Sequence, residues 1–267
     1  MHDEREWDGR SMAAGDGAED AAGLWRRLAG QGAVLLDGFH ALKHALRFGA
    51  TVPVALAADL PAALDLAGSL APDMRDVLAA RLVPTPQPLL RSLVPRPHPT
   101  GVAALALRPP RAANLAALAR LPRTAPVVLL DNPRHLGNAG AVVRLAAGLG
   151  VTGVATTGSL DPWHPAVVRG GAGLHFATPV ERVEPDALPP GPLFALDAEG
   201  DDIRGVALPD DAVLAFGSER SGLSPAVRAR AERLVSLPMR PRVSSYNLAT
   251  SAAMALFHWS SGAAPRP

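Results

Sequence analysis

The sequence predicts an α/β protein with a parallel β-sheet in its C-terminal half and a smaller α/β unit before it. Short unbroken apolar runs such as VVLL at 127–130 alternate with helical patterns, which is typical of buried parallel strands joined by helices. Prolines near both ends of residues 108–126 mark a boundary between the two halves. The chain has 267 residues, 48% of them hydrophobic, which is enough for two packed cores.

The first segment, residues 1–23, is acidic and rich in glycine and alanine, so we expect a flexible tail there. It lacks the basic start and continuous apolar run of a secretory signal, and no later run reaches membrane-spanning length. These features favour a cytoplasmic protein that makes no membrane contact.

Residues 24–108 form the predicted small α/β unit. Its strand and helix patterns alternate over 34–37, 39–49, 52–58, 74–81 and 101–107. Six prolines between residues 84 and 99 predict an ordered but irregular loop. A linker over 109–125 follows, with an alanine- and leucine-rich helix between its prolines.

Residues 126–267 form the predicted second unit. Its buried-strand candidates, in order, are 127–130, 151–157, 192–197, 212–217 and 233–239. The first strand is followed by a helix from about Asn138, and the last helix is expected from about Ser245 to Trp259.

Four of the predicted strands lead into unusual loops. These loops read DNPRHLGNAG, GSLDPWHP, GSERSG and RPRVSSYN, and each has glycine, asparagine, serine or charged residues near the point where a strand ends. Ligands of open parallel sheets bind outside the carboxyl ends of the strands. The four loops together therefore predict one shared pocket.

The helix after the first of these loops surrounds Arg144 with small residues. Gly140 and Gly148 lie at i−4 and i+4, and two mid-helix glycines cost about 1 kcal/mol each relative to alanine, so something should approach closely. Asn138 is the expected N-cap, and Arg144 should lean toward it. Close helix packing beside a surface arginine is the alternative. The expected core face is Val142, Leu145, Ala146 and Leu149.

Composition excludes several kinds of site. With no cysteine, the chain has no disulfide, thiolate metal site or cysteine nucleophile. His135, His164 and His175 are possible general bases by type, but their spacing matches no metal motif, so we expect no metal. Neither a dinucleotide fingerprint nor a P-loop is present. The net charge of +1 means that RNA would have to be met by local arginine clusters.

Three ordered motifs resemble the SpoU or TrmH branch of the knotted SPOUT methyltransferases. The first is NAGAVVR at 138–144, the second is GSERSG at 217–222, and the third combines LPM at 237–239 with SYN at 245–247. GFHALKHAL and PTGVAALAL in the first unit resemble the L30e-like substrate-binding domain that many members carry.

The resemblance implies a deep trefoil knot in the parallel sheet, with the cofactor S-adenosyl-L-methionine bound in it. It also implies a homodimer in which each active site draws residues from both chains. The apolar last helix, which contains SAAMALFHW, would then contribute to the interface between the two subunits.

The family's functional positions can be carried over to this chain. Positions that match the polar residues around the methyl group and the ribose are Asn138, Arg144, Glu219, Ser245 and Asn247. Positions expected to bind the cofactor are Thr157, Asp197, Gly217, Leu237, Met239, Tyr246 and Leu248. Family accounts sometimes make the arginine a base. Because guanidinium groups stay charged in proteins, we favour a role in orienting the 2′-hydroxyl and a phosphate.

The resemblance therefore implies methylation of a ribose 2′-hydroxyl in structured RNA, with ribosomal RNA favoured over transfer RNA because of the first domain. The family's usual Asn-Pro-x-Val-Lys opening is missing, and RGGAG at 169–173 replaces a serine-containing stretch. Because the Asn-Pro-x-Val-Lys opening is missing, the class of RNA substrate stays open. A non-catalytic assembly factor that binds RNA or cofactor is an alternative, and a self-resistance enzyme acting on ribosomal RNA would share the same chemistry.

Overall fold

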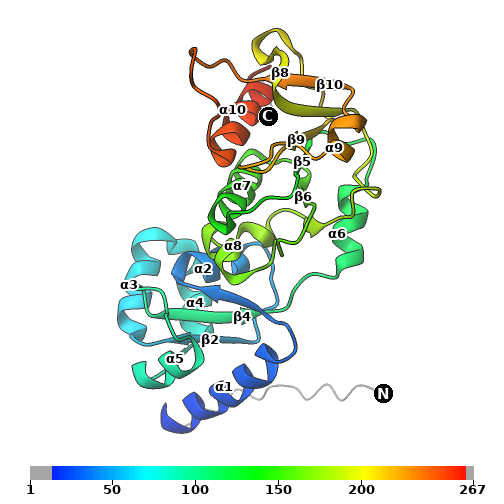
Figure 1. Ribbon diagram of the computed structural model, residues 1–267. Helices are drawn as coiled ribbons and strands as arrows, with labels where there is room; N and C mark the ends of the chain where they lie inside the picture. The colour runs from blue at the N-terminus through cyan, green and yellow to red at the C-terminus, as the bar shows by residue number, and fades with distance from the viewer. Residues whose placement is uncertain (1–13, 263–267) are drawn as a thin grey trace.

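The computed structural model describes residues 14–262 and contains two α/β domains, each built on its own sheet (Figure 1). The elements of the first domain are α1 (Ala14–Ala29), β1 (Val34–Asp37), α2 (Phe39–Arg47), β2 (Val54–Ala57), α3 (Leu60–Leu70), η1 (Pro72–Met74), α4 (Arg75–Arg81), β3 (Leu82–Pro84), α5 (Gln87–Leu93) and β4 (Val102–Ala106).

The linker helix and the second domain follow along the chain. Their elements are α6 (Arg111–Leu118), β5 (Val127–Leu130), α7 (Leu136–Leu149), β6 (Gly153–Thr156), α8 (Pro165–Gly170), η2 (Leu174–Phe176), β7 (Val180–Arg182), β8 (Leu193–Asp202), η3 (Ile203–Gly205), β9 (Val213–Phe216), α9 (Pro225–Arg230), β10 (Arg233–Ser236) and α10 (Leu248–Gly262). None of the helices in residues 14–262 is long and apolar enough to cross a membrane.

The first sheet has the order β1-β4-β2-β3 and mixes antiparallel and parallel pairs. Helices α2, α3 and α4 pack on one face, while α1 and α5 pack on the other. The L30e-like character of this domain stays a prediction.

Helix α1 begins inside the segment expected to be a flexible tail, so that expectation is wrong from residue 14 onward. Ala18, Ala21, Ala22 and Trp25 recur at the helical period and are all buried, which explains why the segment packs on the sheet. The rest of the expected tail, residues 1–13, lies outside the described residues.

The segment expected to be an irregular proline-rich loop also contains regular structure. Strand β3 ends at Pro84, and α5 follows with Pro88 in its first turn, where the missing amide hydrogen has no helical partner to lose. Leu90 on α5 is completely buried. A proline at the start of α5 is therefore compatible with regular helical structure in this segment.

The second sheet is entirely parallel, with the order β10-β8-β9-β5-β6-β7. All five predicted strands are confirmed, and β7 is an additional edge strand. Val128 and Leu130 of β5 face the helix layer that includes α7 and α10, while Val127 and Leu129 face α6 and α9. Burial on both faces explains why this strand is an unbroken apolar run.

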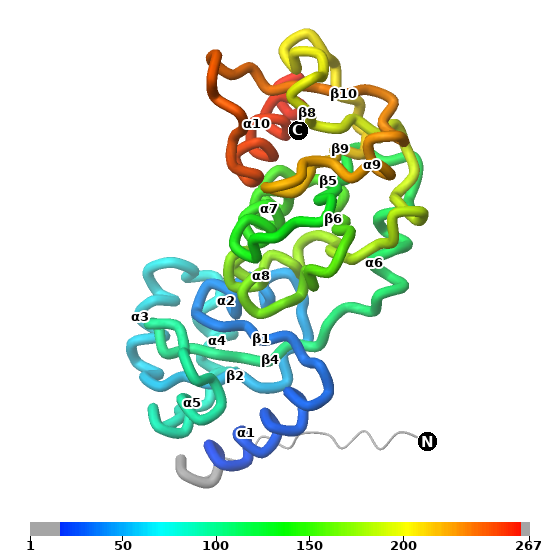
Figure 2. Tube along the Cα trace, in the orientation of Figure 1, coloured from blue at the N-terminus to red at the C-terminus, as the bar shows by residue number. Residues whose placement is uncertain are grey.

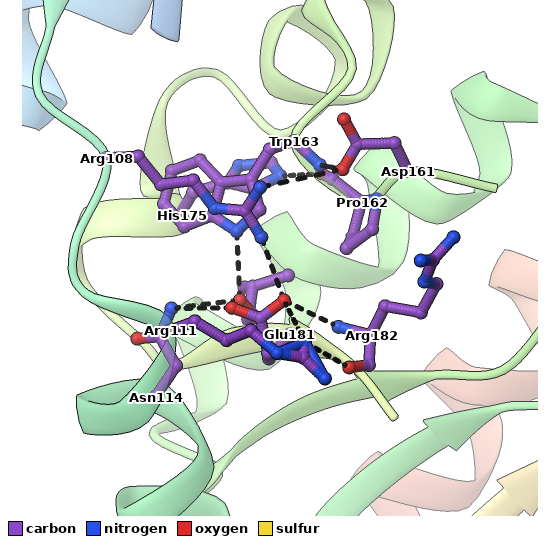
Figure 3. A network of polar contacts seen from close by, with 10 residues as sticks. Arg108, Arg111, Asn114, Asp161, Pro162, Trp163, His175, Glu181 and Arg182 are labelled. Carbon is purple, nitrogen blue, oxygen red and sulfur yellow. Dashed lines mark hydrogen bonds and ion pairs between the residues drawn. The ribbon is translucent and has the colours of Figure 1, made fainter. Parts of the chain in front are cut away.

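The linker is part of the second domain's outer layer. Figure 2 shows it passing along one side of that domain, where α6 packs against β6 and β7. Glu181 of β7 anchors it: its carboxylate, 1% exposed, accepts a 2.8 Å hydrogen bond from Arg108 and lies 3.7 Å from Arg111 (Figure 3). The Arg108 guanidinium also lies 5.3 Å from the centre of the Trp163 ring. These contacts fix the linker where it joins the two domains.

Candidate active site

A cavity of about 560 Å³ lies at the carboxyl ends of β9 and β10 and beside the middle of β8. This is the edge of a parallel sheet where ligands bind. Ten of the twelve residues that the sequence nominates line it: Asn138, Asp197, Gly217, Glu219, Leu237, Met239, Ser245, Tyr246, Asn247 and Leu248. The prediction of one shared pocket is correct for the loops after β5, β9 and β10, whereas the loop after β6 does not line it.

A chain of hydrogen bonds joins the first turn of α7 to two loops at the cavity. Asn138 of α7 donates its amide Nδ2 to Glu219 Oε1 at 2.7 Å, and Asn247 donates its Nδ2 to Asn138 Oδ1 at 3.1 Å. Asn247 Oδ1 in turn accepts the backbone N–H of Ala249 at 2.9 Å, in the first turn of α10. A carboxylate accepts only and a backbone N–H donates only, so the two ends fix the orientation of both amides.

Glu219 is held ionised. Its partial burial would raise its pKa, but hydrogen bonds from the Asn138 amide and from backbone N–H groups, including Arg134 N at 3.1 Å, outweigh that effect and lower it. Glu219 is therefore an acceptor at neutral pH, and it positions Asn138 instead of supplying a proton.

The loop after β9 is a tight reversal. Ser218 and Gly222 exchange backbone hydrogen bonds of 2.9 and 3.0 Å. A Cβ on Gly217 would lie 2.2 Å from the carbonyl carbon of Gly222, so only glycine fits there. This reversal brings Glu219 to the cavity.

The loop between β10 and α10 closes another side of the cavity. Tyr246 donates its hydroxyl to the backbone carbonyl of Pro238 at 3.0 Å, which links the two ends of this loop. Leu237 and Leu248 flank the loop and are buried. The last helix begins at Leu248, not at the expected Ser245, which leaves Ser245 and Asn247 free of the helix to line the cavity.

Asp197 enters the cavity wall from β8 with its carboxylate already oriented. Arg228 of α9 forms an ion pair with Asp197 Oδ2, and the backbone N–H of Glu199 donates to Oδ1 at 3.0 Å. Sequence reasoning did not identify Arg228, which lies within the separate short helix α9.

Thr157 is not at the cavity. It is 1% exposed, donates its hydroxyl to Asp131 Oδ1 at 2.6 Å and accepts the backbone N–H of Asn132 at 3.0 Å. Asp131 Oδ2 accepts the backbone N–H of Ser224 at 2.6 Å. Asp131 therefore ties the ends of β5 and β6 to the loop after β9. Sequence reasoning missed Asp131, although its position directly after the predicted strand VVLL could have indicated it.

Arg144 is also outside the cavity lining, and it is exposed on α7. The close approach expected at its flanking glycines occurs only at Gly140, where a Cβ would lie 2.5 Å from the Val167 carbonyl oxygen of α8, while Gly148 faces open space. Packing between helices, the alternative interpretation, accounts for Gly140.

Two details of α7 differ from expectation. The helix starts at Leu136 with His135 as N-cap, so Asn138 is inside the first turn and its side chain is available to the cavity. On the expected core face, Val142 and Ala146 are fully buried, Leu145 and Leu149 are only partly buried, and Val143 is buried instead.

Of the three histidines considered as bases, only His135 lines the cavity. His164 caps α8 by accepting the backbone N–H of Ala166 at 3.1 Å. His175 is buried, with its Nε2 2.9 Å from the carbonyl oxygen of Pro162. The last two therefore have structural roles.

The fold of this chain is similar to those of solved methyltransferase structures. The crystal structure of the SpoU methyltransferase AviRb from Streptomyces viridochromogenes with AdoMet matches with a TM-score of 0.69 at 23% identity, covering 94% of this chain and 98% of that chain. An RNA 2′-O ribose methyltransferase structure matches with a TM-score of 0.67 at 26% identity, covering 91% and 94%. The chain therefore has the fold of the SpoU methyltransferases.

Residues 125–257 match the SpoU rRNA Methylase family, and the C-terminal domain of this chain belongs to it. A 23S rRNA (uridine(2479)-2′-O)-methyltransferase of Streptomyces viridochromogenes is 33% identical over 144 residues, covering 49% of this chain and 50% of the relative. The mitochondrial rRNA methyltransferase 3 of Mus musculus is 47% identical over 77 residues, 26% of this chain and 18% of the relative. The aligned regions thus span half or less of these two relatives.

Proposed function

We propose that this chain is an S-adenosyl-L-methionine-dependent methyltransferase that modifies a ribose 2′-hydroxyl in ribosomal RNA, and that it acts in the cytoplasm. The observation that carries the proposal is the hydrogen-bonded chain of Glu219, Asn138 and Asn247 at a cavity in a SpoU-family domain. The names of relatives support the substrate, since they include 23S rRNA 2′-O-methyltransferases from two Streptomyces species.

The cavity fits the proposed cofactor. Its volume is in the range of small-molecule sites, and its lining combines apolar side chains such as Leu196 and Leu237 with a few fixed polar groups. Asp197 would hold hydroxyl groups of the cofactor, while Gly217 and Met239 would present backbone groups. When bound, S-adenosylmethionine supplies an electrophilic methyl group.

The chain's own contribution is positioning. Asn138 and Asn247 have fixed amide orientations, and ionised Glu219 holds Asn138 in place. We assign these amides to orienting the ribose at the cavity, because holding reactants in line removes much of the entropic barrier.

We further propose a homodimer that brings Arg144 of one subunit to the cavity of its partner, where it would orient the 2′-hydroxyl and a neighbouring phosphate. Arg144 is on α7 and exposed, and α7 packs beside α10, where Phe257 is 68% exposed. An apolar side chain with so much of its surface exposed to solvent is suited to a subunit interface. Light scattering should give twice the chain mass, and a monomer that methylates RNA would refute this arrangement.

The central test is transfer of a labelled methyl group from S-adenosylmethionine to ribosomal RNA, followed by mapping of the modified position. The expected product carries the label on a ribose. Arg144→Ala should bind the cofactor normally by calorimetry and transfer no methyl group. Methylation of a base would overturn the assignment, and cofactor binding with no transfer to any ribosomal or transfer RNA would favour a non-catalytic binding protein.

A further inference from the structure

Three basic side chains lie within electrostatic range of one another where the two domains join, and we call them the junction cations: His40 and Lys43 on α2, and Arg144 on α7. His40 and Lys43 are three residues apart on one helix and therefore share a face. Arg144 lies close enough to act electrostatically on both. The cluster thus combines residues from both domains.

The junction that carries these residues is tightly packed. His44 Nδ1 lies 2.8 Å from the carbonyl oxygen of Ala172, and a Cβ on Gly173 would lie 2.3 Å from the carbonyl oxygen of Ala41. Both α2 and α7 pack against η2, the short helix between them. The relative positions of the two helices are therefore held by close contacts with the segment around η2.

Lys43 is unusual in its environment. It is the single lysine of the chain and is only 7% exposed, whereas lysines are almost never this buried unless they are paired. Within residues 14–262 it has no hydrogen bond or ion pair. Its ammonium group is not among the enclosed polar atoms that lack a partner, so it reaches the surface.

The nearby carboxylates are already committed to other cations. Asp73 receives three hydrogen bonds from Arg47, at 2.6, 2.7 and 3.1 Å, and Asp37 pairs with Arg169 at 3.0 Å. Like Lys43, Arg144 has no ion pair among the described residues. Lys43 and Arg144 therefore repel each other, and Asp73 compensates the charge of Lys43 only in part.

Burial and the neighbouring positive charges act on the pKa values of both α2 residues. Burial first, and then the charges of Lys43, Arg144 and His98, lower the pKa of His40. Burial first, followed by Arg47 and Arg144, lowers the pKa of Lys43, while Asp73 opposes that effect only in part. A bound anion would relieve the repulsion.

We propose that the junction cations bind a phosphate of the RNA backbone, so that the first domain helps to hold the RNA strand beside Arg144. The assignment rests on the proposed function for the identity of the RNA. Phosphate contacts fix the register of a nucleic acid without reading its sequence, which suits a residue such as Lys43 that presents a point charge. Lys43 and His40 are then positioning residues for the substrate.

The test compares RNA binding by the full chain and by three variants, using 23S ribosomal RNA transcribed in vitro as the probe. Lys43→Met keeps the buried alkyl packing and removes the charge, and Lys43→Arg restores the charge. Arg81→Met, on an exposed helix end of the same domain, is the matched control for loss of one positive charge.

Lys43→Met should weaken RNA binding about 10-fold and reduce the slope of log affinity against log salt by about 1. Lys43→Arg and Arg81→Met should bind like the parent, and all three should retain cofactor affinity. The inference is overturned if Lys43→Met and Arg81→Met lose affinity equally, or if neither does. If the parent binds RNA but transfers no methyl group to it, the proposed function fails, while the comparison of slopes still decides the phosphate site.

Discussion

Acidification should destabilise the protein through His175. This side chain is 2% exposed and packs against Trp163, with 5.2 Å between ring centres, in the cluster of Figure 3. Its Nε2 faces the carbonyl oxygen of Pro162, which fixes the neutral tautomer with the proton on Nε2, and its Nδ1 has no partner within the described residues. A second proton would be buried without an acceptor.

The size of the effect follows from the shifted titration. Burial lowers the pKa of His175 to about 4, and the nearby Pro162 carbonyl and Asp161 only partly oppose this. In the unfolded chain the pKa is about 6.5, so as the pH falls below that value the unfolded state takes up a proton that the folded state does not. Stability therefore falls as pH decreases toward 4, by about 2 kcal/mol between pH 7 and pH 5 from this residue alone.

Urea unfolding followed by tryptophan fluorescence, at both pH values, measures this loss. His175→Gln removes the titration and keeps an amide N–H that can donate to Pro162, so it is the matched control. The free energy of unfolding should fall by about 2 kcal/mol more in the parent than in the variant over this pH range. Equal losses in the two proteins would show that His175 does not titrate as its burial requires.

Three other expectations concern packing and the cavity. Gly140→Ala should lower the free energy of unfolding by about 1–3 kcal/mol because its Cβ has no room, whereas Gly148→Ala should raise it by up to about 1 kcal/mol; urea titration decides both. Glu181→Ala should cost about 1–2 kcal/mol by the same measurement, since Arg108, whose side chain is 34% exposed, loses a charged hydrogen bond, and an unchanged midpoint would contradict this. Asn138→Ala should lower kcat for methyl transfer about 100-fold while the melting temperature stays within a few degrees, and full activity would remove Asn138 from the site.

The strands of the second sheet were predictable because burial on both faces leaves unbroken apolar runs. Strand β7, VER at 180–182, has no such signature, and its place depends on pairing with β6. Helix α1 did carry a signal, since Ala18, Ala21, Ala22 and Trp25 follow the helical period, but its acidic and glycine-rich outer face obscured it. The trefoil knot and the L30e-like character of the first domain stay predictions.

The cavity was largely predictable because three motifs lie at strand ends, and a parallel sheet brings such ends together. The residues that hold the cavity and the linker in place could not be predicted in the same way. Arg228 and Glu181 act through neighbours that are 31 and 73 residues away in the chain, so no local pattern predicts their roles, and the one local signal for Asp131 is its place directly after VVLL. Thr157 was misplaced for the same reason: it does follow β6, but Asp131 holds its hydroxyl beneath the site.

The geometry of α7 explains why Asn138 lines the cavity and Arg144 does not. Six residues separate them, which on an α-helix is about 9 Å along the axis and about 120° around it. Between them Gly140 packs closely against α8, which fixes the side of the helix that faces the cavity. Within one chain, Asn138 therefore lines the cavity and Arg144 does not. If both act on the same ribose, a second subunit must supply one of them, and Lys43 and His40 beside Arg144 would guide the RNA strand to that shared site.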